Sequence, residues 1–253
     1  MSDPRTLYLD LLEKSLADEI YGERPEDIRW RSFLQRLRHP YLTRRGVFPW
    51  PGRAHTMIGR GRLRHLRELV EDVIQRNVPG HFIETGVWRG GACILMRGVL
   101  AAHGVQDRRV YCADSFEGLP PPDSKHPADK RDRLHAFSEL AVSEDTVRSN
   151  FAAYGLLDPQ VVFLKGFFEE TLPKLQDEHF ALIRLDGDMY GSTITALNNL
   201  YDRLSPSGYV VIDDYGGIRS CAKAVTDFLA QRGLTVRIEP VDESCVWWQK
   251  PAA

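Results

Sequence analysis

Short apolar runs alternate with longer amphipathic stretches along most of the chain. The apolar runs predict strands at 80–86, 108–116, 160–166, 180–186 and 208–214. Between them, helical periodicity predicts helices at 91–104, 143–155 and 220–233. Ser143 is a suitable N-cap residue for the second of these helices. This alternation favours an α/β fold, a mostly parallel doubly wound sheet with helices on both faces.

The two ends of the chain depart from this alternation. Residues 234–241 and 244–250 predict two strands joined by a very short turn, so they must pair antiparallel. Near the N-terminus, residues 4–20 predict a helix, and residues 61–75 predict another. The apolar stripe expected for the first helix consists of Leu7, Leu9, Leu11, Leu12 and Leu16.

Residues 22–54 are rich in arginine, proline and aromatic residues and have weak periodicity. Proline and glycine in the segment "FPWPGR" favour an irregular backbone, so this stretch is predicted to be a surface arm or lid. Its basic residues either form a solvated face, or cover a site or a subunit contact. The expected organisation is an N-terminal helix and arm over residues 1–60, followed by the α/β domain over 61–253.

Composition excludes several classes of protein. The 253 residues carry a formal net charge of −2, which gives no basic footprint for a nucleic acid. No apolar run of about 18 residues predicts a membrane span, and the N-terminus lacks the pattern of a secretion signal. Cys93, Cys112, Cys221 and Cys245 have no CxxC spacing, so we expect reduced core thiols in a cytoplasmic protein.

A glycine-rich turn follows the first predicted strand. Gly86, Gly90 and Gly91 let the backbone approach a ligand, and Asp114 ends the next strand, where ribose hydroxyls are commonly bound. The alternative is a plain turn with Asp114 as a cap. The spacing is not GxGxxG, which disfavours a dinucleotide. Glu84 beside the turn would repel a pyrophosphate and suit a cationic sulfonium, which points to a methyl donor.

Four carboxylates end two later strands, Asp186 and Asp188 after one and Asp213 and Asp214 after the next. They are either turn and cap residues or, if the strands are neighbours, a cluster whose repulsion a divalent cation such as Mg²⁺ relieves. Mg²⁺ could chelate two vicinal hydroxyls and lower the pKa of the attacking one. With Asp186, Asp213 and Asp214 as ligands, Asp188 remains as a candidate base.

A histidine in the long Pro-rich, charged loop is the main alternative to Asp188. His135 could act as the base or contact the substrate, or it could be an ordinary surface histidine. Trp247 and Trp248 on the last predicted strand are expected in the core rather than at the site.

Several motifs resemble one family along nearly the whole chain. They are "AHTMIG", "ETGVWRGGACI", "ADSFEGLP", "FAAYGLLD", "RLDGDMYGST", "RLSPSGYVVIDDY" and "VWWQK". With these motifs the chain closely resembles the macrocin O-methyltransferase family of antibiotic biosynthesis. Members of that family methylate a hydroxyl of a deoxysugar attached to a natural-product scaffold.

The resemblance implies a class I methyltransferase fold, Rossmann-like, with N-terminal helices and a lid, and it implies S-adenosylmethionine and Mg²⁺ as cofactors. The donor residues implied are Met57, Glu84, Thr85, Gly86, Val87, Trp88, Asp114, Ser115, Phe116, Glu117, Gly118 and Gly166. Asp186, Asp213 and Asp214 would hold Mg²⁺, with Asp188 as base. A homo-oligomer, dimer or tetramer, is also implied, with the N-terminal segments in its contacts.

The expected function is therefore Mg²⁺-dependent methylation of a sugar hydroxyl on a glycosylated small molecule. Two alternatives stay open, a catechol-type O-methyltransferase of the same fold and a non-catalytic nucleoside-binding protein. The arm at 22–54 and the loop at 120–137 depart most from the family pattern. Both should face the acceptor, so the resemblance leaves its identity open.

Overall fold

A single seven-stranded sheet forms the centre of the computed structural model, which describes residues 3–38 and 50–252. The strand order is β3-β2-β1-β4-β5-β7-β6. The strands are β1 (His81–Thr85), β2 (Val110–Asp114), β3 (Val161–Lys165), β4 (Phe180–Leu185), β5 (Leu204–Ile212), β6 (Glu239–Pro240) and β7 (Val246–Gln249). The first five are parallel, and β7 runs antiparallel to β5 and β6. The predicted doubly wound sheet is confirmed.

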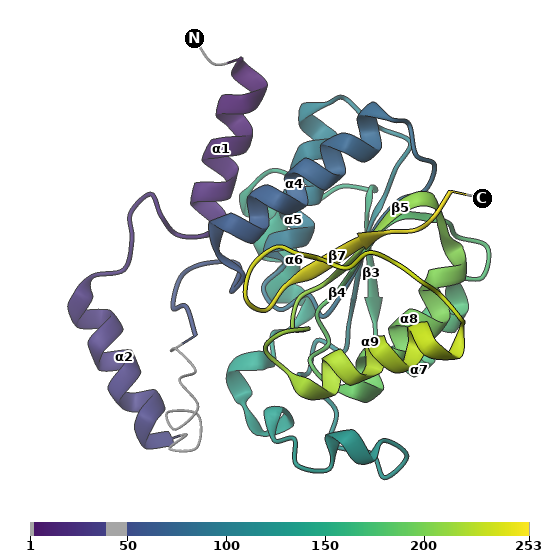
Figure 1. The fold of residues 1–253 in the computed structure, drawn as a ribbon. Helices are drawn as coiled ribbons and strands as arrows, with labels where there is room; N and C mark the ends of the chain where they lie inside the picture. Colours follow the sequence, from purple (N-terminus) through teal and green to yellow (C-terminus); the bar gives the residue numbers. More distant parts are fainter. Residues whose placement is uncertain (1–2, 39–49, 253) are drawn as a thin grey trace.

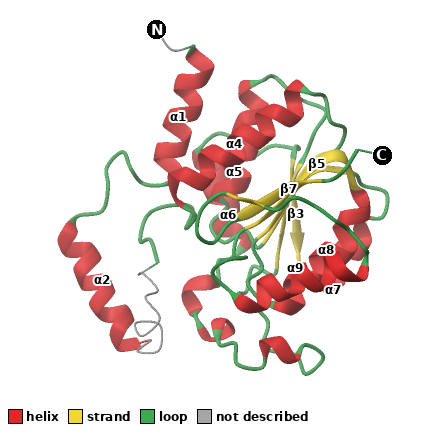
Figure 2. Ribbon diagram, viewed as in Figure 1, coloured by secondary structure: helices red, strands yellow, loops and turns green. Residues whose placement is uncertain are grey.

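Helices cover both faces of this sheet (Figure 1, Figure 2). One face carries α1 (Pro4–Leu16), α4 (Gly59–Gln75), α5 (Gly91–Ala102) and α6 (Glu144–Ala153). The other carries α7 (Phe168–Thr171), α8 (Tyr190–Leu200) and α9 (Arg219–Gln231). Each layer buries an apolar core against the sheet, so β1 and β4 have buried residues on both sides.

Helix α6 begins as its sequence predicts. The Ser143 hydroxyl accepts a hydrogen bond from the backbone N–H of Thr146 at 3.3 Å, which caps the helix. Two acidic residues, Glu144 and Asp145, occupy its first turn, where negative charge is favourable.

The predicted arm contains a helix, α2 (Pro25–Arg38), which its weak periodicity did not predict. Helix α2 stands apart from the rest of the fold (Figure 1). Its Ile28, Trp30 and Phe33 side chains are exposed. A helix that buries no face against a core needs no regular apolar stripe, which is why periodicity missed it. Residues 39–49 of the predicted arm lie outside the described residues.

The apolar residues of α1 do not form the single stripe that was expected. Leu9, Leu12 and Leu16 are buried in the core, whereas Leu7 and Leu11 are 55% and 56% exposed. At about 100° per residue, the two exposed leucines lie on the opposite side of the helix. Helix α1 therefore has two apolar faces, of which one packs on α5 and the other is exposed.

The C-terminal hairpin is shorter than predicted. Only Glu239 and Pro240 of the predicted strand 234–241 pair with β7. This strand lies at the edge of the sheet, where the chain has hydrogen-bond partners on one side only. Trp248 of β7 is fully buried, as expected for a core residue, and Trp247 packs partly buried against the other core.

All four cysteines are buried and none forms a disulfide, in agreement with the sequence prediction. Among the described residues, no helix combines the length and the apolar character that crossing a membrane would require.

Candidate functional site

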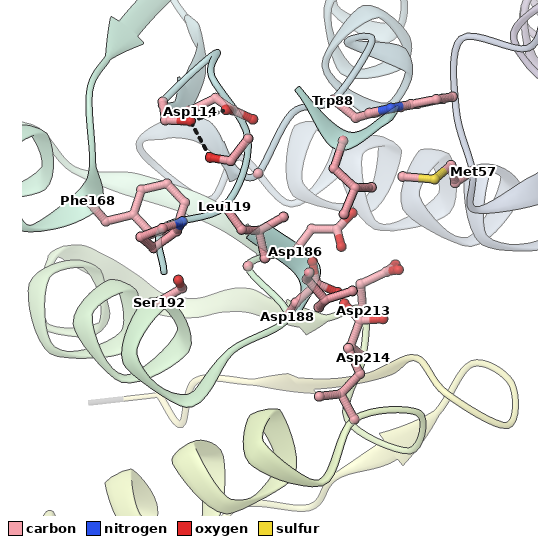
Figure 3. Close-up of a pocket in the computed structure, with 18 of the residues that line it drawn as sticks. Met57, Trp88, Asp114, Leu119, Phe168, Asp186, Asp188, Ser192, Asp213 and Asp214 are labelled. Carbon is pink, nitrogen blue, oxygen red and sulfur yellow. Dashed lines mark hydrogen bonds between the residues drawn. The ribbon is translucent and has the colours of Figure 1, made fainter. Parts of the chain in front are cut away.

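A cavity of about 400 Å³ opens at the carboxyl ends of the parallel strands, a size typical of small-molecule sites. Residues from almost every loop at this edge line it (Figure 3). The apolar part of the lining is made by Trp50, Met57, Ile58, Trp88, Leu119, Pro120, Leu134, Leu140, Phe167, Phe168 and Ile218. Most of these come from loops far apart in the sequence. Met57 and Trp88 were predicted as donor residues, whereas Trp50, Leu134, Leu140, Phe167, Phe168 and Ile218 lie outside the family motifs.

The glycine turn after β1 brings two strand ends together. Gly86 has a φ of 88°, and a Cβ there would lie 1.9 Å from the carbonyl oxygen of Asp186. Only glycine therefore allows the turn to touch the segment that follows β4. Trp88, in the same turn, donates its indole N–H to the Glu139 carbonyl at 2.9 Å. The turn thus contacts both the segment that follows β4 and the segment that contains Glu139.

Asp114 holds this turn in place. Its carboxylate accepts hydrogen bonds from the backbone N–H groups of Val87 (2.6 Å) and Phe116 (2.7 Å). Burial raises the pKa of Asp114, and these hydrogen bonds oppose that shift. Asp114 also lines the cavity, at the position where a strand-end acid meets a ribose in doubly wound sheets.

The residues predicted to bind the donor divide into two groups. Met57, Gly86, Trp88, Asp114, Ser115 and Gly118 line the cavity. Glu84, Thr85, Val87, Phe116, Glu117 and Gly166 are not part of the lining. Among the second group, Val87 and Phe116 still act on the site by donating their N–H groups to Asp114.

Glu84 has a different environment from the one that its sequence position suggested. Its side chain is buried and accepts hydrogen bonds from Arg184 and, at 2.9 Å, from the Cys93 thiol. Burial raises the pKa of Glu84 to about 7, although Arg184 opposes this shift. Because its carboxylate meets Arg184 rather than the cavity, the charge argument for a sulfonium beside Glu84 does not hold.

Three carboxylates form an acidic cluster, Asp186, Asp213 and Asp214, with ligand oxygens all within 4.8 Å of one another. They meet because β4 and β5 are neighbours, with Leu185 opposite Ile212. One oxygen of Asp214, Oδ2, is buried without a hydrogen-bond partner. Such a buried, unsatisfied carboxylate oxygen, beside two others, fits a hard divalent cation.

Two arginines compensate part of this negative charge. Buried Arg184 bonds to Glu84, to Asp186 at 2.8 Å and to Asp213. Arg62, from α4, donates to Asp213 at 2.6 Å and also pairs with Asp242 at 2.6 Å. Sequence reasoning missed both arginines. A charged residue inside the apolar strand "FALIRL" was the available signal for Arg184.

Asp188 lies beside the acidic cluster and also lines the cavity (Figure 3). Burial raises its pKa well above the usual value, and repulsion from Asp186 and Asp132 adds to the shift. Burial and the neighbouring carboxylates likewise raise the pKa of Asp214 well above its usual value. Burial raises the pKa of Asp213 to about 6, although the positive charge of Arg184 opposes this shift.

His135 does not line the cavity. It lies in a short 3₁₀ helix, Leu134–Ala136, and its side chain is exposed, whereas its neighbour Leu134 reaches the cavity wall. Of the two predicted bases, the structure therefore brings only Asp188 to the acidic cluster.

Comparison with known proteins gives a match over almost the whole chain. Residues 5–250 match the model of a family described as macrocin-O-methyltransferase (TylF).

Two curated relatives are similar over almost their full length. The demethyldecarbamoylnovobiocin O-methyltransferase of Streptomyces niveus is 46% identical, covering 97% of this chain and 94% of its own. The 8-demethyl-8-(2,3-dimethoxy-alpha-L-rhamnosyl)-tetracenomycin-C 4'-O-methyltransferase of Streptomyces olivaceus is 47% identical, covering 99% and 95%. Among solved structures, the O-methyltransferase NovP superimposes with a TM-score of 0.86 at 44% identity, covering 98% of this chain and 99% of NovP.

Proposed function

The chain belongs to the macrocin-O-methyltransferase family, and on that premise we propose that it methylates a sugar hydroxyl of a glycosylated natural product. It is an S-adenosylmethionine-dependent O-methyltransferase. The methyl carbon leaves the sulfonium sulfur and bonds to the hydroxyl oxygen, while the hydroxyl proton passes to a base. The observation that carries this proposal is Asp188 beside the acidic cluster, in the cavity that the glycine turn also lines.

The donor binds on the side of the cavity made by the glycine turn and the end of β2. Asp114 would bond to the ribose hydroxyls, since an acid at this strand end does so in doubly wound sheets. Met57 and Trp88 line the same cavity and would pack against the donor. The adenosine and the methyl group are thereby held between the turn and the acidic cluster.

The acidic cluster is suited to Mg²⁺. Asp186, Asp213 and Asp214 would be its ligands. The Asp214 Oδ2 atom has no hydrogen-bond partner, so it is free to coordinate the ion. When bound there, Mg²⁺ would lower the pKa of a chelated sugar hydroxyl and orient it. Arg184 and Arg62 fix the Asp213 carboxylate from both sides, so this ligand keeps its position.

Asp188 takes the hydroxyl proton. A carboxylate whose pKa is raised by burial accepts a proton more readily than an exposed one. His135 is exposed and absent from the cavity wall, so it is the weaker candidate.

The N-terminal segment, residues 1–60, would cover this site and make subunit contacts in a homo-oligomer, a dimer or tetramer. Trp50, Met57 and Ile58 from this segment already line the cavity. The exposed apolar residues of α1 and α2 support a contact with a second copy.

A panel of acceptors tests the proposed substrate class. Demethyldecarbamoylnovobiocin and the rhamnosyl-tetracenomycin substrate of the relatives above represent glycosides, and simple catechols represent the alternative class. We expect methyl transfer from S-adenosylmethionine to a glycoside, identified by mass spectrometry and located on the sugar by NMR. Turnover of catechols alone would contradict the sugar assignment.

Chelation tests the metal. We expect EDTA to stop turnover and Mg²⁺ to restore it, and we expect Mg²⁺ to raise the Tm of the free enzyme by mass action. Asp214→Asn should remove that rise in Tm without loss of donor binding. Asp202, exposed and outside the cavity, provides the control Asp202→Asn. Full turnover in excess EDTA would refute the Mg²⁺ role.

A further inference from the structure

The long loop at residues 117–137 contains one deeply buried carboxylate in its middle part. Between residues 121 and 136, Asp129 alone is fully buried, with 1% of its surface exposed. Its neighbours Lys125, Lys130 and Arg131 are exposed. A carboxylate buried within an exposed, charged loop needs strong partners, because an unpaired buried charge is very unfavourable.

Those partners are the first two N–H groups of helix α8. One Asp129 oxygen accepts from Tyr190 and the other from Gly191, each at 2.8 Å. Met189, the residue before the helix, makes no capping hydrogen bond with its side chain. Asp129 therefore caps α8 from a distant part of the sequence, and the helix dipole strengthens the contact.

Two further contacts show how closely the loop approaches the helix. A Cβ at Gly191 would lie 2.7 Å from the His126 ring, so glycine makes room for the loop. The rings of His126 and Tyr190 lie 5.5 Å apart.

The capped helix begins two residues after Asp188, so the contact holds the loop close to the proposed base. Asp132 donates its backbone N–H to the Asp129 carbonyl at 2.7 Å. Leu134, two residues further on, lines the cavity. Both residues are placed by the loop segment that Asp129 anchors.

We propose that Asp129 is a positioning residue, which holds the long loop against α8 so that the loop forms the acceptor wall above Asp188. The part of this inference that concerns acceptor binding rests on the proposed function, whereas the anchoring of the loop does not. Without Asp129 the loop would populate open states. The apparent affinity for an acceptor would then fall in proportion to the fraction of molecules whose loop remains closed. The donor side, built on β1 and β2, would be unaffected.

Limited proteolysis of the full-length protein tests the anchoring. Trypsin cleaves after Lys125, Lys130 and Arg131, all exposed in the loop. We expect Asp129→Ala to be cut in this loop at least about tenfold faster than the wild type, because cleavage follows the population of the open form. Asp129→Asn keeps one acceptor oxygen and should be intermediate. Asp123→Ala changes an exposed aspartate of the same loop, and this variant should be cut at the wild-type rate.

Kinetics with demethyldecarbamoylnovobiocin, or another glycoside that the wild type methylates, tests the consequence. We expect the acceptor KM to rise about tenfold in Asp129→Ala and less in Asp129→Asn. The donor Kd and, at saturating acceptor, kcat should stay near the wild-type values. A purely structural role as helix cap would instead lower Tm and weaken donor and acceptor alike, and would overturn the proposal.

The two readouts separate the possible failures. If loop cleavage and acceptor KM are unchanged in both Asp129 variants, Asp129 does not anchor the loop, while wild-type turnover still supports the proposed function. If the wild type methylates no glycoside but Asp129→Ala is cut faster, the anchoring stands and the proposed substrate class fails.

Discussion

At the scale of single residues, one glycine separates Asp186 from Asp188, yet the two carboxylates have different surroundings. Asp186 accepts a hydrogen bond from Arg184 at 2.8 Å and belongs to the acidic cluster. Asp188 has a φ of 57°, and this left-handed turn directs it away from the strand. A Cβ at Gly187 would lie 2.9 Å from that of Ser192, so the tight turn requires glycine there. The turn geometry assigns separate positions to the two acids.

Asp188→Asn tests the role of Asp188 as base. We expect kcat to fall by about 10²–10⁴-fold, because an amide cannot accept the hydroxyl proton. Donor affinity, measured by calorimetry, should be unchanged, since Asp188 lies on the opposite side of the cavity from Asp114 (Figure 3). His135→Asn is the matched comparison and should retain wild-type kcat. A larger loss in His135→Asn than in Asp188→Asn would reverse the assignment.

Arg184→Met tests the buried charge network. Arg184 is 2% exposed and bonds to three carboxylates, so its removal leaves buried negative charges uncompensated. We expect the free energy of unfolding to fall by roughly 3–5 kcal/mol, measured in urea.

A surface arginine gives the control for this experiment. Arg237 pairs with Glu239 but is 89% exposed, so Arg237→Met should change stability by less than about 0.5 kcal/mol. Equal effects of the two substitutions would show that Arg184 has no special structural role.

At the scale of elements, the segment before α4 is tied to the glycine turn. We call residues 50–57 the strap, and its Trp50 and Met57 line the cavity. A single nitrogen of Arg89, in the glycine turn, donates to the carbonyls of Pro51, Gly52 and Ala54 at 2.9–3.1 Å. The Arg89 guanidinium also lies 4.2 Å from the centre of the Trp88 ring. The strap and the turn therefore form one wall of the site.

Arg89→Ala should loosen the strap and weaken donor binding. Hydrogen bonds from a charged donor contribute about 1.5–3 kcal/mol, so we expect the donor Kd to rise by roughly tenfold or more. Isothermal titration calorimetry measures this directly. Arg148→Ala, at a position in α6 that pairs with Glu144 and does not line the cavity, should leave the donor Kd unchanged. An unchanged Kd in Arg89→Ala would show that the strap does not contribute to the donor site.

At the scale of the whole molecule, the N-terminal helices carry exposed apolar surface that the sheet does not cover. Leu7 and Leu11 of α1 are more than half exposed, as is Trp30 of α2, which stacks on Phe33 with ring centroids 5.6 Å apart. Exposed apolar residues on these two helices favour a contact between subunits. We therefore expect a second copy of the chain to bury it.

Light scattering after size exclusion tests this expectation. The wild type should have a mass of two or four chains of 28.8 kDa, and the double variant Leu7→Glu, Leu11→Glu should shift toward one chain because charge is disfavoured in a buried interface. Leu157, 40% exposed elsewhere on the molecule, gives the control Leu157→Glu. A monomeric wild type would contradict the proposal.

The sequence by itself determined the order of the strands along the chain, the glycine turn and the four strand-end acids. These features are local, since they depend on the period of apolar residues and on the backbone freedom of glycine. Neighbouring strands β4 and β5 then brought the acids together, as the sequence suggested.

Tertiary structure alone decided which groups each acid meets. In the fold, Glu84 bonds to Arg184, Asp213 bonds to Arg62, and Asp129 caps the N-terminus of α8. The partners in each of these contacts lie far apart in the chain. Tertiary structure also left α2 apart from the sheet, where no apolar stripe is required. The periodicity of a sequence reports which face of an element is buried. Pairings between charged groups depend instead on distances between elements, which only the packed fold fixes.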